Sequence, residues 1–257
     1  MTGRTVRAFV WRRIDFRETS RLVTLFTREA GRVHALAKGA HRPTSTFLGR
    51  LDFLNLVDAT LAGKGAGLLL LSRVRLVHEP RGLREPARFF AANHLAELCD
   101  QASAGDRPDP DLFDLLAGGV TLLERCPTAA LPAIVLGIEL RWLGILGLLP
   151  PLLECSQCGA PAAGRRPLHA GRPGEGLLCR QHAPERREPV ALPVLELLHA
   201  LATQPARAWD SLPVGPELAK GSALVGRWVA AALEHRPRFR GAALGRPEAS
   251  APADRAV

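Results

Sequence analysis

The chain has 257 residues, of which 47% are hydrophobic and 23% are charged, as in an ordinary globular protein. This composition excludes a wholly disordered chain, and the absence of tyrosine excludes any mechanism that uses a tyrosine acid. The longest uncharged run, Cys126–Ile138, is too short to cross a membrane. We therefore expect no membrane span, and the start of the chain suggests no secretory signal.

The positive charge is concentrated in the first third of the chain. The formal net charge is +9, and residues 1–79 alone hold 14 basic and 6 acidic residues. This asymmetry predicts a polyanionic partner for that segment, with nucleic acid favoured over an anionic membrane. A soluble protein with a generally basic surface is the alternative interpretation.

Residues 1–79 are predicted to form a small barrel. Alternating and β-branched runs predict five strands, which are Val6–Arg13, Ser20–Thr27, Arg32–Lys38, Leu51–Leu61 and Leu68–His78. Five short strands favour an OB-fold, and an SH3-like barrel is the alternative. Gly31 is expected to take a positive φ in a hairpin turn. Gly63-Lys64-Gly65 lacks the spacing of a phosphate-binding loop, which favours a tight turn.

A basic strip is expected on one face of the third strand, opposite a face of small apolar residues that suits a barrel interior. The cations of this strip, which continue into the following loop, are Arg32, His34, Lys38, Arg42 and Arg50. No acidic residue lies between them. This pattern favours contacts with phosphates over a merely solvated face.

The first strand carries a second candidate surface. Period two places Phe9 and Trp11 on one face together with Arg7 and Arg13. A groove that binds single-stranded nucleic acid has cationic side chains that contact the phosphates and aromatic rings that stack on the bases. Arg7, Trp11 and Arg13 are therefore candidate nucleic-acid contacts. For both aromatic residues, ordinary core packing is the alternative.

The segments 80–150 and 190–240 are predicted to form one helical domain. The most apolar stretch, Leu131–Leu149, is expected to be its central helix. Asp109 stands where a helix cap belongs, and this interpretation is stronger than a metal-binding pair with Asp111. Residues 241–257 are rich in Ala, Pro, Gly and Arg and are predicted to be a disordered tail.

Paired cysteine spacing predicts a zinc ribbon over residues 151–189. Cys155-x2-Cys158 is followed after twenty residues by Cys179-x2-His182. Two such turns bring four soft ligands together in a tetrahedral site. Because four protein ligands leave no open coordination position, we expect one structural zinc ion per chain.

Two alternatives accompany this zinc site. His169 lies inside the spacer and could replace His182, and the spacing of the cysteines could also arise by chance. Cys99 and Cys126 lie in apolar helical stretches and are expected to be small buried side chains. An odd number of cysteines argues against a disulfide framework and favours a reducing cytoplasm.

The order of several short motifs resembles that of a known family. Four runs, Glu18–Ser20, Leu25–Val33, Ala37–Ala40 and Gly49–Leu51, resemble the N-terminal signature of the bacterial recombination mediator family RecO. The segment before that family's zinc ribbon resembles Ile138–Leu143, Leu146–Pro150 and Cys155-x2-Cys158-Gly159. The resemblance covers roughly residues 4–182, in the right order.

The resemblance implies an α+β protein with an N-terminal OB-fold and a helical domain that carries a zinc ribbon. It implies binding of single- and double-stranded DNA, annealing of complementary strands, and loading of RecA, together with RecR, onto DNA coated by single-strand-binding protein. It implies no enzymatic activity. The helical domain is expected to bind the acidic C-terminal tail of single-strand-binding protein.

The sequence departs from the family at two places. The fourth zinc ligand of the family is usually cysteine, and His182 stands there. The family often has Arg or Phe just before or at Ile138, where this chain has Leu136, Gly137 and Ile138. The second departure puts the residues that bind the tail in doubt.

An acidic tail that ends in an apolar residue needs an apolar pocket with a cation at its rim. Arg141, on the most apolar helix, is the candidate cation, with Arg125 in reserve. The alternative is that Arg141 pairs inside the bundle with Glu97, Asp100 or Glu139.

Two other functions are weighed against the mediator. An RNA-binding zinc-ribbon protein of ribosome assembly could use the same basic strip, because phosphate contacts do not discriminate between sugars. A metal-dependent nuclease would need clustered carboxylates and an open metal site, and the sequence indicates neither.

Overall fold

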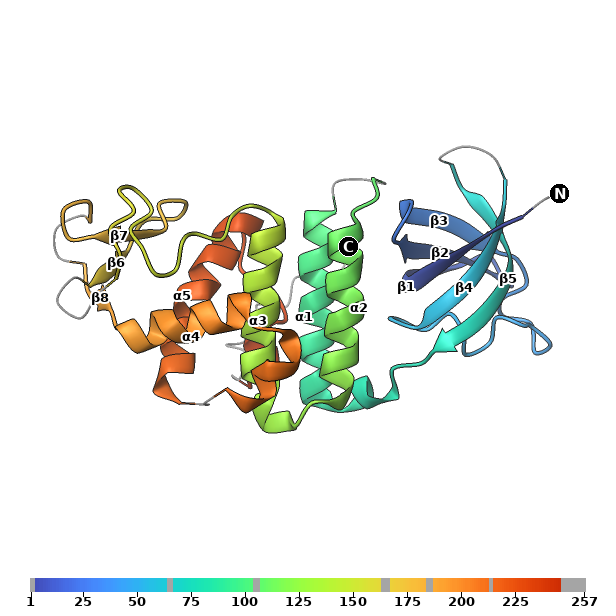
Figure 1. Ribbon diagram of the computed structural model, residues 1–257. Coiled ribbons are helices and arrows are strands. Elements are labelled where there is room, and N and C mark those ends of the chain that lie inside the picture. The colour runs from blue at the N-terminus through green and yellow to red at the C-terminus, as the bar shows by residue number, and fades with distance from the viewer. Residues whose placement is uncertain are drawn as a thin grey trace, which may run out of the picture. The chain divides into compact units, whose positions relative to one another are not determined.

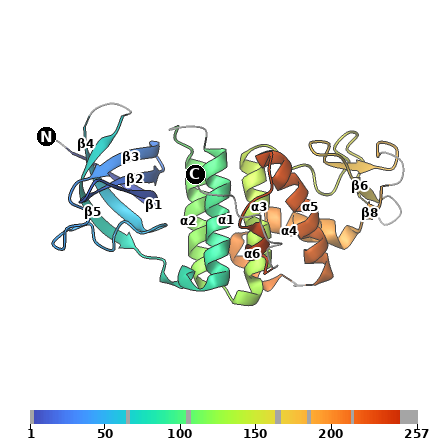
Figure 2. The ribbon, with the colours of Figure 1, turned by 180° about the vertical axis from the view of Figure 1, so that it is seen from behind.

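The computed structural model describes residues 3–63, 67–103, 107–162, 167–183, 187–212 and 215–245. The chain divides into two compact units, whose elements are labelled in Figure 1 and seen from behind in Figure 2. The barrel unit comprises Met1–Arg81 and Ala102–Val120, and the helical unit comprises Gly82–Gln101 and Thr121–Val257.

Five strands of the barrel unit close in the order β1-β2-β3-β5-β4. They are β1 (Arg4–Phe16), β2 (Ser20–Thr27), β3 (Gly31–Ala37), β4 (Leu56–Ala62) and β5 (Leu69–His78). Only β3 and β5 pair in parallel among these neighbours. The predicted five-stranded barrel is confirmed, and its order is compatible with the OB-fold. The fourth strand begins at Leu56 rather than Leu51, because the chain turns before it.

Small residues fill the barrel interior, as the alternation predicted. Ala35 and Ala37 of β3 are fully buried, and Ala8 and Val10 of β1 are fully buried in the same core. The turn between β2 and β3 contains Gly31, whose φ of 63° most side chains avoid. The turn predicted at Gly63-Lys64-Gly65 falls on residues 64–66, which lie outside the described residues.

The helices are α1 (Pro86–Ala102), α2 (Pro110–Arg125), α3 (Leu131–Ile145), α4 (Leu192–Thr203), α5 (Pro216–Leu233) and α6 (Arg240–Ala243). Three short 3-10 helices accompany them, at Arg81–Arg84, Thr128–Ala130 and Ala206–Ser211. α3 is central in the helical unit, where it packs against α4 and α5. The stretch Thr128–Ile145 is long and apolar enough to cross a membrane, but 67% of it is buried, as in the core helix of a bundle.

The start of α2 belongs to the barrel unit. The side chain of Asp109 accepts a hydrogen bond from the backbone N–H of Leu112 at 3.0 Å, which supports the capping role over a metal-binding one. One turn into this helix, Phe113 packs against Phe9 and Phe26 of the barrel, with ring centroids 5.5 and 6.0 Å apart. The first turns of α2 thereby cover part of the outer wall.

A three-stranded sheet follows α3 and carries the predicted ribbon. Its strands are β6 (Leu168–Ala170), β7 (Leu177–Cys179) and β8 (Pro189–Val190), in the order β7-β6-β8. The last helix, α6, includes residues 241–243, so the disorder predicted for the segment 241–257 is wrong for these residues. Residues 246–257 of that segment lie outside the described residues.

Candidate metal centre and nucleic-acid interface

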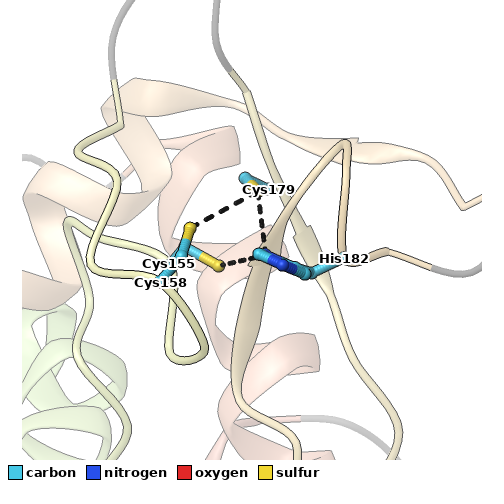
Figure 3. A group of neighbouring side chains, drawn as sticks. All are labelled: Cys155, Cys158, Cys179 and His182. Atoms are coloured by element: carbon cyan, nitrogen blue, oxygen red, sulfur yellow. Dashed lines mark hydrogen bonds between the residues drawn. The ribbon is translucent and has the colours of Figure 1, made fainter.

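Two turns of the ribbon bring four ligand atoms together. Figure 3 shows the side chains of Cys155, Cys158, Cys179 and His182, whose ligand atoms all lie within 4.8 Å of one another. The Sγ of Cys179 lies 3.4 Å from Nδ1 of His182 and 3.8 Å from Sγ of Cys158. In a tetrahedron with Zn–S bonds of about 2.3 Å, two sulfurs are about 3.8 Å apart. The arrangement therefore has the dimensions of a zinc site.

Backbone hydrogen bonds shape both turns. The N–H of Gly159 donates to the carbonyl oxygen of Cys155 at 2.8 Å, and a φ of 68° at this position favours glycine. The N–H of His182 donates to the carbonyl oxygen of Cys179 at 3.0 Å. Each pair of ligands is thus fixed by its own tight turn.

The surroundings of Cys155 favour its thiolate. Burial raises the pKa of this thiol, but backbone N–H groups of Cys179, Gln157 and Cys158 donate to the sulfur and lower the pKa to about 6. The thiolate is the form that binds zinc. Three soft sulfurs and an imidazole complete a tetrahedron, so the donor set fits a structural zinc ion.

The alternative ligand His169 lies apart from this cluster. It is the middle residue of β6, and its Nδ1 lies 2.8 Å from the carbonyl oxygen of Arg187, to which it donates. Its side chain is not among the four that converge. The geometry therefore supports His182 as the fourth ligand.

A β-bulge reverses the alternation predicted for the first strand. Val10 lies opposite Leu25, but Arg12 lies opposite Thr24, so Trp11 is the extra residue of the bulge. Beyond it, the side chains that point away from the barrel interior are those of the even-numbered residues. They are Arg12, Ile14 and Phe16.

The register of β1, β2 and β3 builds one continuous surface, which we call the outer sheet face. Its three rungs are Arg12–Thr24–His34, Ile14–Leu22–Leu36, and Phe16–Ser20 with Lys38, which follows β3 and continues its register. The side chains of Arg12, His34 and Lys38 are exposed. The outer sheet face thus carries cations and apolar side chains, and no rung contains a carboxylate.

The predicted basic strip lies only partly on this face. His34 and Lys38 are on it, and Nδ1 of His34 lies 3.1 Å from the hydroxyl of Thr24. Arg32 lies on the neighbouring rung, but it is half-buried and donates to the carbonyl oxygen of Ser103. Arg32 therefore helps to hold the chain that covers the barrel.

The two cations of the following loop differ in their surroundings. Arg42 is exposed. Arg50 is half-buried, and its guanidinium donates to the carbonyl oxygen of Val74 in β5 at 2.9 Å. The side chain of Arg42 is therefore accessible to a phosphate, whereas that of Arg50 links its loop to β5 of the barrel.

The two arginines predicted on β1 take part in ion pairs. Nε of Arg7 lies 2.9 Å from a carboxylate oxygen of Asp58, which also accepts a hydrogen bond from Arg75. Arg13 pairs with Asp52 on the opposite side of the strand from Arg12. Exposed pairs of this kind contribute little stability and separate readily.

The prediction that Trp11 stacks on bases is wrong, and its alternative, core packing, holds. Trp11 is 4% exposed, and its ring centroid lies 5.2 Å from that of Phe26 and 6.5 Å from that of Phe53. Phe9 is also buried, against Phe113. Neither ring is available to a base.

Arg141 has other contacts than those predicted for it. Its guanidinium donates to the carbonyl oxygen of Gln204 at 2.8 Å and lies 4.6 Å from the ring centroid of Trp209. Partial burial lowers its pKa. It does not pair with Glu139, which binds Arg240 instead at 2.7 Å. Arg141 is thus tied to Gln204 and Trp209 within the helical unit.

Sequence reasoning missed the apolar part of the outer sheet face. Ile14 is 63% exposed and Phe16 is 37% exposed. If the alternation that starts at Val6 continued through β1 without a bulge, the odd-numbered residues, such as Trp11 and Arg13, would lie on this face. An alternating run starting at Arg12 was the one signal that could have indicated the correct set.

Comparison with known proteins covers nearly the whole chain. The family model described as Recombination protein O N terminal matches residues 1–80, and the one described as Recombination protein O C terminal matches residues 83–240. A protein named DNA repair protein RecO from Anaeromyxobacter sp. (strain K) is 34% identical over 220 residues, which are 84% of each chain.

Two further relatives carry the same name. The protein from Myxococcus xanthus (strain DK1622) is 34% identical over 232 residues, which are 89% of this chain and 92% of the relative. The protein from Bacillus subtilis (strain 168) is 28% identical over 186 residues, which are 72% of this chain and 70% of the relative.

Proposed function

The chain belongs to the RecO family of DNA repair proteins, and on that premise we propose that it is a recombination mediator. It binds single- and double-stranded DNA and anneals complementary strands. Together with RecR, it helps to load RecA onto DNA coated by single-strand-binding protein. It acts in the cytoplasm, at the nucleoid, and catalyses no covalent step.

The observation that carries this proposal is the cationic character of the outer sheet face. Arg12, His34 and Lys38 are exposed on it, and exposed Arg42 lies in the loop that follows β3. Cations spread over a sheet neutralise successive phosphates without reading sequence. Such a surface suits a protein that must act on any broken DNA.

Annealing follows from the same charges. Two complementary strands repel each other through their phosphates, and a surface that neutralises these phosphates lowers the repulsion. Phosphate contacts leave the base edges accessible, so that the bases can pair with a second strand. No nucleophile or general base is needed, and we assign no catalytic residue.

We assign the zinc ion a structural role. Cys155, Cys158, Cys179 and His182 would hold it with no open position. Ligation fixes the two turns of a ribbon whose own sheet is small. Loss of the metal should therefore disturb the ribbon and leave the barrel unit intact.

The tail of single-strand-binding protein needs an apolar pocket with cations at its rim, and a pocket in the helical unit supports this partner better than Arg141 does. The pocket has a volume of about 590 Å³ and is lined by residues of the ribbon, α4 and α5. Buried Val194 and Leu224 give it an apolar floor, and exposed Lys220 and Arg227 stand two helical turns apart on α5.

A labelled peptide with the acidic tail sequence tests this partner. Lys220→Ala combined with Arg227→Ala should weaken its binding about tenfold, because both cations of α5 are lost. Arg141→Ala is the matched comparison. Peptide binding is measured by fluorescence anisotropy. If Arg141→Ala lost more affinity for the peptide than the double variant, Arg141 would be the cation that binds the tail.

Binding of purified protein to labelled single-stranded DNA, with RNA of the same sequence as competitor, tests the main proposal. We expect DNA binding that RNA does not abolish at equal concentration. Stronger binding of RNA would favour a ribosome-assembly factor. Incubation of the same DNA with Mg²⁺ should leave it intact, and cleavage would favour a nuclease.

A further inference from the structure

The half of β1 beyond its bulge differs from the first half. β1 pairs with β4 only from Arg4 to Phe9, whereas its pairing with β2 continues to Phe16. The two strands therefore extend past the β4 side of the barrel as a hairpin. On this hairpin two large apolar side chains, Ile14 and Phe16, are 63% and 37% exposed.

These side chains belong to an ordered pattern on the outer sheet face. Ile14 lies in the middle rung with Leu22 and Leu36, which are half-buried. The rungs on either side contain Arg12 and Lys38. Side chains two residues apart on a strand are about 7 Å apart. An apolar rung is thus flanked by cations at a spacing that an extended nucleic-acid strand can match.

Contacts on both sides of the hairpin hold it in place. On the side opposite Ile14, the carboxylate of Asp15 accepts hydrogen bonds from Nε of Arg21 at 2.8 Å and from Nε2 of His41 at 2.9 Å. At the tip, the guanidinium carbon of Arg17 lies 5.3 Å from the ring centroid of Phe16. Ile14 and Phe16 therefore lie on a paired β-hairpin that side-chain contacts hold in place.

We propose that Ile14 and Phe16 contact the faces of unpaired bases, while Arg12 and Lys38 hold the neighbouring phosphates. The proposal rests on the proposed function and names its ligand class, single-stranded nucleic acid. A base has an apolar flat face beside an anionic phosphate, and this surface offers a matching partner to each. In a duplex the base faces are stacked on one another and closed to such contacts.

Contacts with base faces would make the protein prefer a single strand with bases over the same strand without bases, which contacts with phosphates alone cannot do. A surface that reads only phosphates binds a strand equally well with or without its bases. If Ile14 and Phe16 contact bases, removal of the bases lowers the affinity although every phosphate remains.

Three probes of equal length separate these contributions. They are a labelled single strand, the same backbone with abasic sites throughout, and the corresponding duplex, all titrated by fluorescence anisotropy with the full-length protein. We expect the wild type to bind the single strand about tenfold more tightly than the abasic strand, the effect of contact with about one base.

Variants of Ile14 and Phe16 test whether these two side chains cause the preference for the single strand over the abasic strand. Ile14→Ala combined with Phe16→Ala should lower affinity for the single strand about tenfold and leave affinity for the abasic strand unchanged. Phe16→Trp, which keeps a ring, should retain the preference. Leu148→Ala is the control, because Leu148 is also a large exposed apolar residue, at 51%, but belongs to the helical unit. Unchanged binding of the abasic strand also shows that the double variant folds.

Two results would overturn this inference while the proposed function stands. One is equal affinity of the wild type for the single and abasic strands. The other is a double variant that keeps the wild-type preference for the single strand over the abasic strand. Failure of the wild type to bind any of the three probes would instead overturn the proposed function itself.

Discussion

Nε2 of His94 lies 2.7 Å from a carboxylate oxygen of Glu139 in the interior of the helical unit, where the two side chains are 1% and 0% exposed. Arg240 donates to the same carboxylate through Nε at 2.7 Å and through Nη2 at 2.8 Å. A buried carboxylate on α3 is thereby satisfied from α1 and from α6. The contact ties the short last helix to the centre of the bundle.

The protonation of this pair is set by its partners. Burial alone would lower the pKa of His94, but its hydrogen bond to Glu139 and the carboxylate of Glu97, which lies 3.8 Å from Nδ1, raise the pKa above its ordinary value of 6.5. Burial alone would raise the pKa of Glu139, but the hydrogen bond from His94 and the charge of Arg240 lower it below 4.5. At a pH between these two pKa values, a charged His94 and an ionised Glu139 therefore coexist in the folded state.

We predict that the stabilisation by His94 depends on pH. Because its pKa is higher in the folded than in the unfolded state, the contribution is complete below about pH 6.5 and is lost as the pH rises through the raised value. The contribution of Glu139 is lost on the acid side, below about pH 4.5. The melting-temperature difference between the wild type and His94→Gln should therefore narrow from pH 6 to pH 9. Exposed His199→Gln is the control, and a constant difference for His94→Gln would contradict the prediction.

Arg240→Ala should destabilise the helical unit strongly. It removes one partner of a buried carboxylate, and breaking such a pair costs about 3 kcal/mol of unfolding free energy. Urea denaturation measures this loss. Arg238→Ala, in an exposed neighbour, should cost less than about 0.5 kcal/mol. Equal losses in the two variants would show that Glu139 does not depend on Arg240.

Metal analysis should find one zinc ion per chain in reduced wild-type protein. Cys158→Ser should lose this zinc, because it removes one of four ligands, and it should destabilise the ribbon. His169→Gln should keep the zinc, since His169 lies outside the cluster. Loss of zinc in His169→Gln would assign the fourth ligand to His169, and retention of zinc in Cys158→Ser would contradict the proposed ligand set.

The salt dependence of single-strand binding should report the phosphate contacts. Lys38→Ala combined with Arg42→Ala should reduce the slope of log K against log salt by about 1.4, which is about 0.7 for each contact. Arg50→Ala should reduce the slope less than either of these changes, because Arg50 is half-buried and its guanidinium is directed to the carbonyl oxygen of Val74. Exposed Arg73 on β5 provides the matched control, as Arg73→Ala. An unchanged slope in the double variant would make the strip a solvated face.

The barrel and the metal site could be predicted from the sequence for different reasons. Strands with one buried face alternate with period two, so Ala35 and Ala37 indicate the interior directly. The four metal ligands are recognised by local spacing, and each pair is closed by a turn of four or five residues such as Cys155–Gly159. Both signals depend on short stretches of chain.

Features that depend on distant segments could not be predicted in this way. The bulge at Trp11 arises from register with β2, and within β1 only the new alternating run that starts at Arg12 indicates it. The partners of Arg141 come from residues more than sixty positions away, Gln204 and Trp209. For this reason neither the shared face of Arg12, Ile14 and Phe16 nor the packing of Arg141 on Trp209 could be predicted from the sequence.

Annealing of two complementary labelled strands, followed by fluorescence energy transfer, tests the central claim most directly. The wild type should accelerate annealing of naked strands and of strands coated by single-strand-binding protein. Lys38→Ala combined with Arg42→Ala should lose most of this acceleration, while Arg73→Ala retains it. An annealing rate with wild-type protein no higher than that without protein, or full activity in the double variant, would contradict the account.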